Sequence, residues 1–216
     1  MTIRSVSVGA VAILGVSAIA APTAGVASMA SPNVARIQPP PCAPIVPTAI
    51  QVGPGAYGPQ TQKGLVPGWQ QSWIWVNGAT DESVTSTPIS LFDSGTSATS
   101  YAFTFFAAGT YTYHSTGAAV PDGVVEVKIC QLPATAHQGA VVYGQIASVH
   151  HSGWVEDVQY HRPGASTWQW LAYGSTADWF NFTAGRVGTY YVRTRLRQTS
   201  TNKTSGFSPT GAVKVS

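Results

Sequence analysis

Apolar and polar residues alternate in short runs along most of the chain, and turn residues separate the runs at intervals of about 8 to 12 residues. Alternation with a period of two is typical of strands that bury one face. Regularly spaced strands of this kind are typical of sandwiches and barrels, so the pattern predicts an all-β protein. The predicted strands are residues 72–76, 101–105, 110–113, 124–129, 140–143, 155–160, 168–171, 180–182, 189–196 and 211–215.

Composition supports this class of fold. Of the 216 residues, 44% are hydrophobic and only 9% are charged, which is unlike the highly charged, weakly hydrophobic composition of disordered chains. The 3.6-residue pattern of helical bundles is absent from the sequence, and the Val, Thr, Tyr, Trp and Phe content favours pleated surfaces. The net charge of +3 is dispersed. Because nucleic-acid binding requires clustered Lys and Arg, we expect no nucleic-acid partner.

The first 30 residues have the pattern of a secretory signal peptide. Arg4 provides a short positive region, residues 6–21 are apolar, and an Ala-x-Ala-like sequence ends at Ala30. A membrane anchor of about 20 apolar residues is the main alternative, but Gly and Ser interrupt the stretch and a proline follows it. We therefore expect a protein secreted to the extracellular space or the cell surface, with no stable membrane insertion after cleavage.

A Pro-rich segment over 31–44 is expected to lead into the first folded domain in an extended conformation. This segment contains Cys42, one of two cysteines in the chain, and the other, Cys130, follows the predicted strand 124–129. Since thiols of exported proteins tend to pair, we expect a disulfide between Cys42 and Cys130. The alternative is that both are free, buried thiols.

A change of charge near Pro133 suggests two domains, over 45–131 and 132–216. Residues 39–130 carry two basic and five acidic side chains, whereas residues 131–216 carry seven basic and three acidic ones. Such an asymmetry either helps two domains to dock or reflects two separately solvated faces, and the second interpretation is the simpler one.

Five motifs follow one another in the first half of the chain: residues 73–77, 91–95, 101–105, 108–113 and 123–127. Their order resembles a cupredoxin of the plastocyanin and amicyanin type. This resemblance implies a Greek-key β-sandwich, and in that family a copper ion held by two His, one Cys and a weak axial Met.

The four ligand positions that the resemblance implies lack these residues. Glu82 and Ala118 stand where the family has histidines, Ser115 stands where it has cysteine, and Pro121 stands where it has methionine. A blue-copper site requires the thiolate, so we expect a copper-free domain with no bound metal or cofactor.

An alternative function remains open for this half. A copper-binding or electron-transfer protein with atypical ligands would draw on His114, Glu82 and Asp122. Nothing in their spacing requires a site, and a lone histidine is more often an ordinary surface residue.

In the second half, four motifs occur at residues 155–160, 163–168, 188–195 and 204–209. Their order resembles a fibronectin type III domain, or more broadly an immunoglobulin-like sandwich, so the expected architecture is two β-sandwich domains in sequence.

Trp154, Trp179, Arg193 and Arg195 are the candidate ligand-binding residues of this half. Exposed tryptophans stack on sugar rings or anchor a protein partner. The arginines, with Arg197, share one strand face, where they either meet an acidic glycan or an acidic protein, or cover aromatic rings with their alkyl stems. The same alternation puts both rings of the run Trp-Gln-Trp at 168–170 on one face, and its first tryptophan is expected in the core.

No catalytic residue is predicted. The sequence contains no Gly-x-Ser-x-Gly elbow and no phosphate-binding glycine loop. The only adjacent acids are at 81–82 and 156–157. Neighbouring side chains on a strand point to opposite faces, so neither pair resembles the two facing carboxylates of a glycosidase. We therefore expect a secreted, non-catalytic binding or structural protein whose partner is an envelope glycan or an extracellular protein. A module that accompanies a secreted enzyme is a further possibility if Trp154 and Trp179 are exposed.

Overall fold

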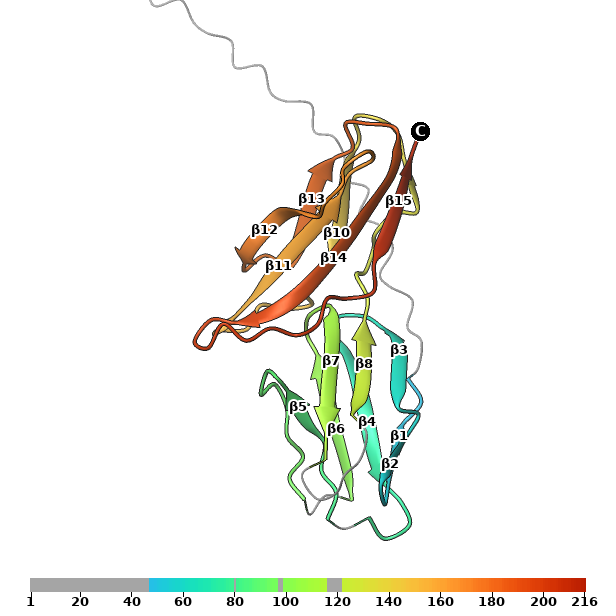
Figure 1. The fold of residues 1–216 in the computed structure, drawn as a ribbon, viewed down its shortest axis with the longest axis vertical. Helices are drawn as coiled ribbons and strands as arrows, with labels where there is room; N and C mark the ends of the chain where they lie inside the picture. The colour runs from blue at the N-terminus through green and yellow to red at the C-terminus, as the bar shows by residue number, and fades with distance from the viewer. Residues whose placement is uncertain (1–46, 80, 97–98, 116–121) are drawn as a thin grey trace, which may run out of the picture. The chain divides into compact units, whose positions relative to one another are not determined.

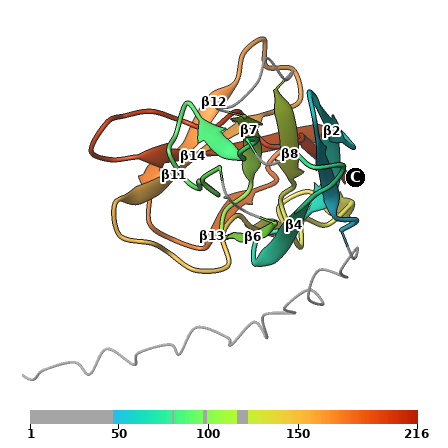
Figure 2. The same cartoon turned by 90° about the horizontal axis from the view of Figure 1, so that it is seen from below.

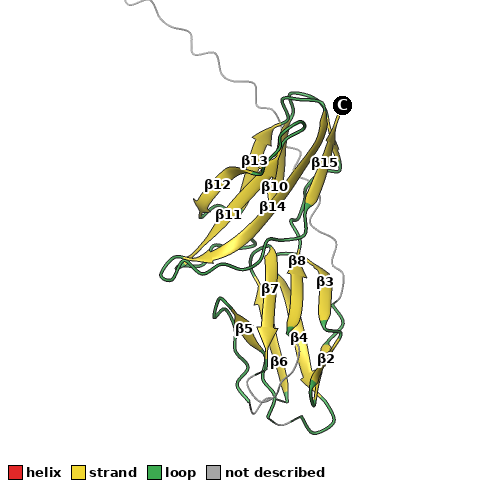
Figure 3. Cartoon of the chain, viewed as in Figure 1, coloured by secondary structure: helices red, strands yellow, loops and turns green. Residues whose placement is uncertain are grey.

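A computed structural model describes residues 47–79, 81–96, 99–115 and 122–216 of the chain. Within these residues the secondary structure consists of strands and turns, without a helix, so the predicted all-β class is confirmed (Figure 3). In the same residues there is accordingly no helical segment with the length and apolarity that crossing a bilayer demands. The signal peptide predicted over 1–30 and the segment over 31–44 lie outside the described residues.

The first half of the described chain forms two four-stranded sheets. One has the order β2-β1-β4-β6 and the other β3-β8-β7-β5. Figure 2 shows β7 and β8 in a different layer from β4 and β6. The parallel pairs are β1 with β4 and β3 with β8, and the remaining pairs are antiparallel. The strands are β1 (Ile50–Gly53), β2 (Ala56–Gly58), β3 (Thr61–Leu65), β4 (Trp69–Trp75), β5 (Thr85–Thr87), β6 (Ser100–Phe105), β7 (Gly109–His114) and β8 (Gly123–Val127).

Aromatic side chains fill the core between these two sheets. Trp73 is completely buried, and its ring lies 5.5 Å from that of Phe92 and 5.6 Å from that of Tyr113. Along β7 and β8 every second residue is buried, which is the alternation that the sequence predicts for one buried face. These large rings therefore make up much of the core of this half.

The second half forms a five-stranded sheet, in the order β12-β11-β14-β15-β9, and a two-stranded sheet of β10 and β13. Figure 1 shows β14 between β11 and β15, at the centre of the larger sheet. Consecutive strands leave one sheet for the other between β12, β13 and β14, as in immunoglobulin-like sandwiches. The strands are β9 (Thr135–Ala136), β10 (Val141–Gln145), β11 (Trp154–His161), β12 (Gln169–Ser175), β13 (Trp179–Thr183), β14 (Gly188–Gln198) and β15 (Gly211–Val215).

Each predicted strand corresponds to an observed one, whereas β1, β2, β3, β5 and β9 were not predicted. These strands have two to five residues, and β3, Thr-Gln-Lys-Gly-Leu, carries little apolar alternation. Such segments pair because a neighbouring strand offers unpaired backbone groups, which a single-sequence pattern does not reveal.

Each sheet takes its strands from one side of the predicted 131/132 boundary, and the boundary itself stays a prediction. Backbone hydrogen bonds cross it. The N–H of Thr110 donates to the carbonyl of Gly206 at 3.0 Å, and the N–H of Gly206 donates back at 2.9 Å. Cys130 and Gln145 exchange a similar pair at 2.9 and 2.8 Å.

Gly144, in β10, provides a test of the packing across the two-stranded sheet, because it pairs with Phe180 of β13. A Cβ at this position would lie 2.5 Å from the ring of the buried Phe180. We expect Gly144→Ala to lower the free energy of unfolding by about 1 to 3 kcal/mol, because the ring must leave its rotamer. Urea denaturation measures the loss. Gly185→Ala is the control, because nothing lies within 4 Å of its added methyl group, and equal stability of the two variants would contradict the packing argument.

Candidate anion-binding surfaces

Arginines and aromatic rings share the outer face of the larger sheet in the second half. Arg193, Arg195 and Arg197 alternate along β14, so their side chains lie on one face, as predicted. The intervening Thr194 and Leu196 are completely buried on the other face. We call the group on the outer face the arginine–aromatic stack: Trp168, Trp170, Tyr173, Arg193, Arg195, Arg197 and Phe207.

At one end of the stack, Arg193 lies between two rings. Its Cζ is 4.1 Å from the ring centroid of Trp168 and 4.1 Å from that of Phe207. Its Nη2 also donates to Oε1 of Gln159 at 2.8 Å. Burial lowers the pKa of Arg193, and the neighbouring Arg195 lowers it further, although a guanidinium remains charged in proteins. Both faces of this cation are therefore covered by apolar rings.

At the other end, Arg195 and Arg197 contact the rings of Trp170 and Tyr173, with Cζ-to-centroid distances of 5.6 and 4.3 Å. Residues three apart on a regular strand point to opposite faces. Between Gln159 and Val158, β11 advances by one residue while β12 advances by two, from Trp170 to Ala172. This one extra residue returns Tyr173 to the face of Trp170. The two rings then meet edge to face at 5.3 Å.

The carboxylate of Asp157 lies beneath the arginines and is completely buried. Its Oδ2 accepts hydrogen bonds from Nε of Arg195 at 3.2 Å and from Nε of Arg197 at 3.0 Å. Its Oδ1 accepts one from Nη2 of Arg197 at 3.1 Å and one from the N–H of Gly174 at 3.0 Å. The hydrogen bonding with Asp157 raises the pKa of Arg197. Asp157 thus fixes the arginines to the sheet and neutralises one of their three charges.

Positive charge dominates the surface of this half. Of its three acidic residues, Glu156 and Asp157 are buried, and Asp178 is half-buried. In contrast, four of its cations are exposed to solvent: Arg162, Arg186, Lys203 and Lys214. The surface of this half therefore carries a larger positive excess than its amino-acid composition alone indicates.

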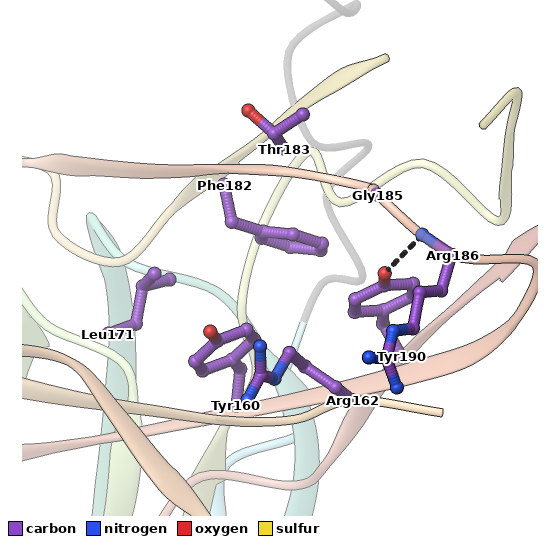
Figure 4. Close-up of a pocket in the computed structure, with 8 residues that line it drawn as sticks. All are labelled: Tyr160, Arg162, Leu171, Phe182, Thr183, Gly185, Arg186 and Tyr190. Atoms are coloured by element: carbon purple, nitrogen blue, oxygen red, sulfur yellow. Dashed lines mark hydrogen bonds between the residues drawn. The ribbon is translucent and has the colours of Figure 1, made fainter. Parts of the chain in front are cut away.

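A cavity of about 360 Å³ opens between β11, β12 and β13. Figure 4 shows the rings of Tyr160, Phe182 and Tyr190 along its wall, with the guanidinium groups of Arg162 and Arg186 beside the two tyrosines. The backbone N–H of Arg186 donates to the hydroxyl of Tyr190 at 2.9 Å. Leu171, Thr183 and Gly185 complete the lining.

In the first half, two of the positions compared with cupredoxin ligands are buried and close together. Oγ of Ser115 accepts a hydrogen bond from the N–H of Ser83 at 3.1 Å, and Oε1 of the adjacent Glu82 lies 3.4 Å from the N–H of Gly55. The other two compared positions, at 118 and 121, lie outside the described residues. The resemblance to cupredoxins receives no further support from these contacts.

The atypical metal site is not assembled in the described part of the chain. His114 is half-buried at the end of β7 and Asp122 is exposed, whereas Glu82 is buried. Among the residues that the structure describes, no three His, Cys, Asp or Glu side chains are close enough to hold a metal ion.

Trp154 and Trp179 are both partly buried. The ring of Trp154 lies 6.3 Å from that of Phe106, in the first half. Trp170, at 48% exposure, is the more accessible ring. A ligand role for Trp154 and Trp179 stays a prediction, and so does the disulfide: Cys130 is buried and is not a free thiol, but Cys42 lies outside the described residues.

The expectation that Trp168 lies in the core is wrong. Its ring is partly exposed and lies under the guanidinium of Arg193, on the same outer face as Trp170. Alternation shows that the two tryptophans share a face but not which face it is. Asp157 was not predicted as the partner of the arginines, although an acid within a predicted strand of the same half as an Arg-x-Arg-x-Arg strand was a usable signal.

Neither a protein-family model nor a curated protein matches the chain. Among solved structures it is similar to the FN1-FN3 domains of chicken CNTN1, with 10% identity over 80% of this chain and 66% of that one, and a TM-score of 0.32. It is also similar to fibronectin(III)-like modules of Clostridium thermocellum CbhA, with 13% identity over 70% of this chain and 86% of that one, and a TM-score of 0.25. Because both TM-scores are low, the all-β class rests on the sheet topology of the chain itself and not on these similarities.

Proposed function

We propose that this is a secreted, non-catalytic binding protein whose second half binds an acidic glycan at the cell surface or in the extracellular space. The arginine–aromatic stack is the proposed binding face. The first half is proposed to be a copper-free sandwich of cupredoxin type that supports the second without chemistry of its own.

The observation that carries the proposal is the pairing of exposed rings with excess positive charge on one face of the sheet. Trp170 and Tyr173 are 48% and 63% exposed, which is high for large apolar side chains. The stack contains three arginines, and the buried carboxylate of Asp157 beneath it neutralises one of their charges, so two positive charges are left over. A neutral ligand would leave this excess positive charge uncompensated.

Each kind of side chain in the stack suits one part of an acidic sugar. An exposed aromatic ring packs against the apolar face of a pyranose, and a guanidinium binds a carboxylate or sulfate through paired hydrogen bonds. The hydrogen bonds of Asp157 and Gln159 already hold the arginines in place. Binding would therefore cost little side-chain entropy.

Affinity electrophoresis of the mature chain through gels containing polygalacturonate tests this function, with neutral dextran as the comparison polymer. We expect polygalacturonate, but not dextran, to retard the protein. Raising the salt from about 50 to about 300 mM NaCl should weaken the retardation, because exposed charges are screened beyond a Debye length. Equal retardation by dextran, or none by polygalacturonate, would contradict acidic-glycan binding, and retention on an acidic protein alone would favour a protein partner.

Replacing the exposed rings tests the location of the site. Trp170→Ala is expected to weaken polygalacturonate binding by about three- to ten-fold, which corresponds to the loss of one aromatic contact. Ile74→Ala, which removes an exposed apolar side chain from β4 in the first half, is the matched control and should bind as the unmodified protein does. If both variants bind unchanged, the glycan does not use the stack.

A further inference from the structure

We infer that the cavity between β11, β12 and β13 is a second site, which binds a small organic anion made of a flat apolar ring and a carboxylate. This inference is independent of the proposed glycan function, because the cavity and the arginine–aromatic stack share no residue.

The walls of the cavity suit a flat ring. The rings of Phe182 and Tyr190 are stacked at 5.2 Å with an angle of 30° between their planes, and the ring of Tyr160 lies 5.9 Å from that of Phe182. Leu171 adds an aliphatic surface. An apolar cavity of about 150 Å³ accepts benzene in another protein. A volume of about 360 Å³ therefore has room for a ring and a short substituent.

Two arginines give the cavity its preference for anions. Arg162 and Arg186 are both exposed and both contribute to the lining, and Figure 4 shows their guanidinium groups at the aromatic wall. Within the described chain, the ion pairs of arginine are those of Arg195 and Arg197 with Asp157, so neither lining arginine is neutralised by a carboxylate. Two guanidiniums without a carboxylate partner beside these aromatic rings favour a ligand that carries its own negative charge.

Contacts within the protein hold the floor of the cavity. Tyr190 is 1% exposed and its hydroxyl accepts the hydrogen bond from the backbone of Arg186, which fixes the loop after β13. The Cζ of Arg162 lies 5.8 Å from the ring centroid of Tyr160, so this side chain rests on an aromatic face. A site whose aromatic walls are held in place loses little entropy on binding.

Phenylacetate and its neutral isostere phenylacetamide are the probes that separate the requirement for a negative charge from the requirement for a ring. Titration calorimetry of the full mature chain, at low salt, should detect phenylacetate, and phenylacetamide should bind about ten-fold more weakly because it lacks the charge-assisted hydrogen bonds. Acetate, which lacks the ring, should also bind about ten-fold more weakly, because it buries no apolar surface. Equal affinity for phenylacetate and phenylacetamide would overturn the inference.

Substitutions of exposed residues locate the site without disturbing the fold. Arg162→Gln and Arg186→Gln are each expected to weaken phenylacetate binding by about three- to ten-fold. Lys203→Gln removes an exposed cation elsewhere in the same half and should have no effect. Equal losses in all three variants would mean that net charge, and not the cavity, attracts the anion, and would overturn the inference. Trp170→Ala should leave phenylacetate binding intact, so failure of the glycan proposal and failure of this one are distinguishable.

Discussion

Asp157→Ala is expected to lower the free energy of unfolding by about 3 to 5 kcal/mol, because it leaves arginines without the buried carboxylate that binds them. Arg197 is only 8% exposed, and three of its hydrogen bonds go to Asp157. A cation at this depth cannot recover its hydration when the partner is removed. The loss should be measured by urea denaturation at neutral pH, from the unfolding midpoint and slope.

A double-mutant cycle separates the ion pair from simple loss of packing. Asp157→Ala, Arg197→Met and the double variant are compared, and the double variant should be more stable than the sum of the single losses predicts, by about 1 to 3 kcal/mol. Asp81→Ala, which removes an exposed acid of the first half, is the control and should change stability by less than about 0.5 kcal/mol. A loss below about 1 kcal/mol for Asp157→Ala would show that the arginines do not depend on this carboxylate.

Glu156→Gln is expected to stabilise the protein above pH 7 by about 2 to 3 kcal/mol and to remove most of its pH dependence between about pH 4.5 and pH 7. Glu156 is 1% exposed, and neither carboxylate oxygen accepts a hydrogen bond from another residue in the described chain. Burial, and to a smaller extent the nearby carboxylate of Asp178, raise the pKa of Glu156 from 4.5 to about 7.

The sign of the effect follows from proton uptake. The folded chain holds a proton on Glu156 up to about pH 7, whereas the unfolded chain releases it near pH 4.5. Between these values the folded state binds more protons, so stability falls as the pH rises and stays low above pH 7. The neighbouring hydroxyl of Tyr111 donates to the carbonyl of Ala107 at 2.7 Å, and burial raises its pKa, so it stays neutral throughout this range.

Thermal and urea unfolding at pH 5 and pH 8 measure this effect. The unmodified protein should lose stability between the two values, and Glu156→Gln should lose much less. Glu126→Gln, on the partly exposed face of β8, should reproduce the difference seen in the unmodified protein. A Glu156→Gln variant with the same loss between pH 5 and pH 8 as the unmodified protein would show that another group controls the pH dependence.

The sequence predicts long strands well and the site only in part. Runs such as 189–196 alternate over several residues, so their period and their buried face are visible without a structure. Short strands such as β9 and β2 exist because a neighbour pairs with them, and nothing in their own residues requires it. The common face of Arg193, Arg195 and Arg197 follows from spacing alone, because they are separated by one residue each on a strand.

The rest of the site depends on information that spacing does not contain. The register shift between Trp170 and Ala172 of β12 brings Tyr173 to the face of Trp170, whereas strict alternation places it on the opposite face. Asp157 is buried against arginines of β14, which lie 38 and 40 residues further along the chain. The cavity is lined from β11, β12, β13 and β14, so no local motif marks it.

The backbone pairing of Thr110 with Gly206 has a consequence for how the second half can be reused. Thr110 also donates through Oγ1 to the carbonyl of Phe207 at 2.7 Å, and Phe207 is the ring between Arg193 and Arg195. A residue of β7 therefore anchors the segment that supplies one ring of the stack. A recombination event that transferred residues 132–216 alone to another gene would carry the arginines but lose the hydrogen bonds with Thr110, and this segment would then be held by its bonds to β14, such as that from the N–H of Ser208 to the carbonyl of Thr194 at 2.7 Å. Such a transfer would therefore weaken the support of one ring of the stack, that of Phe207.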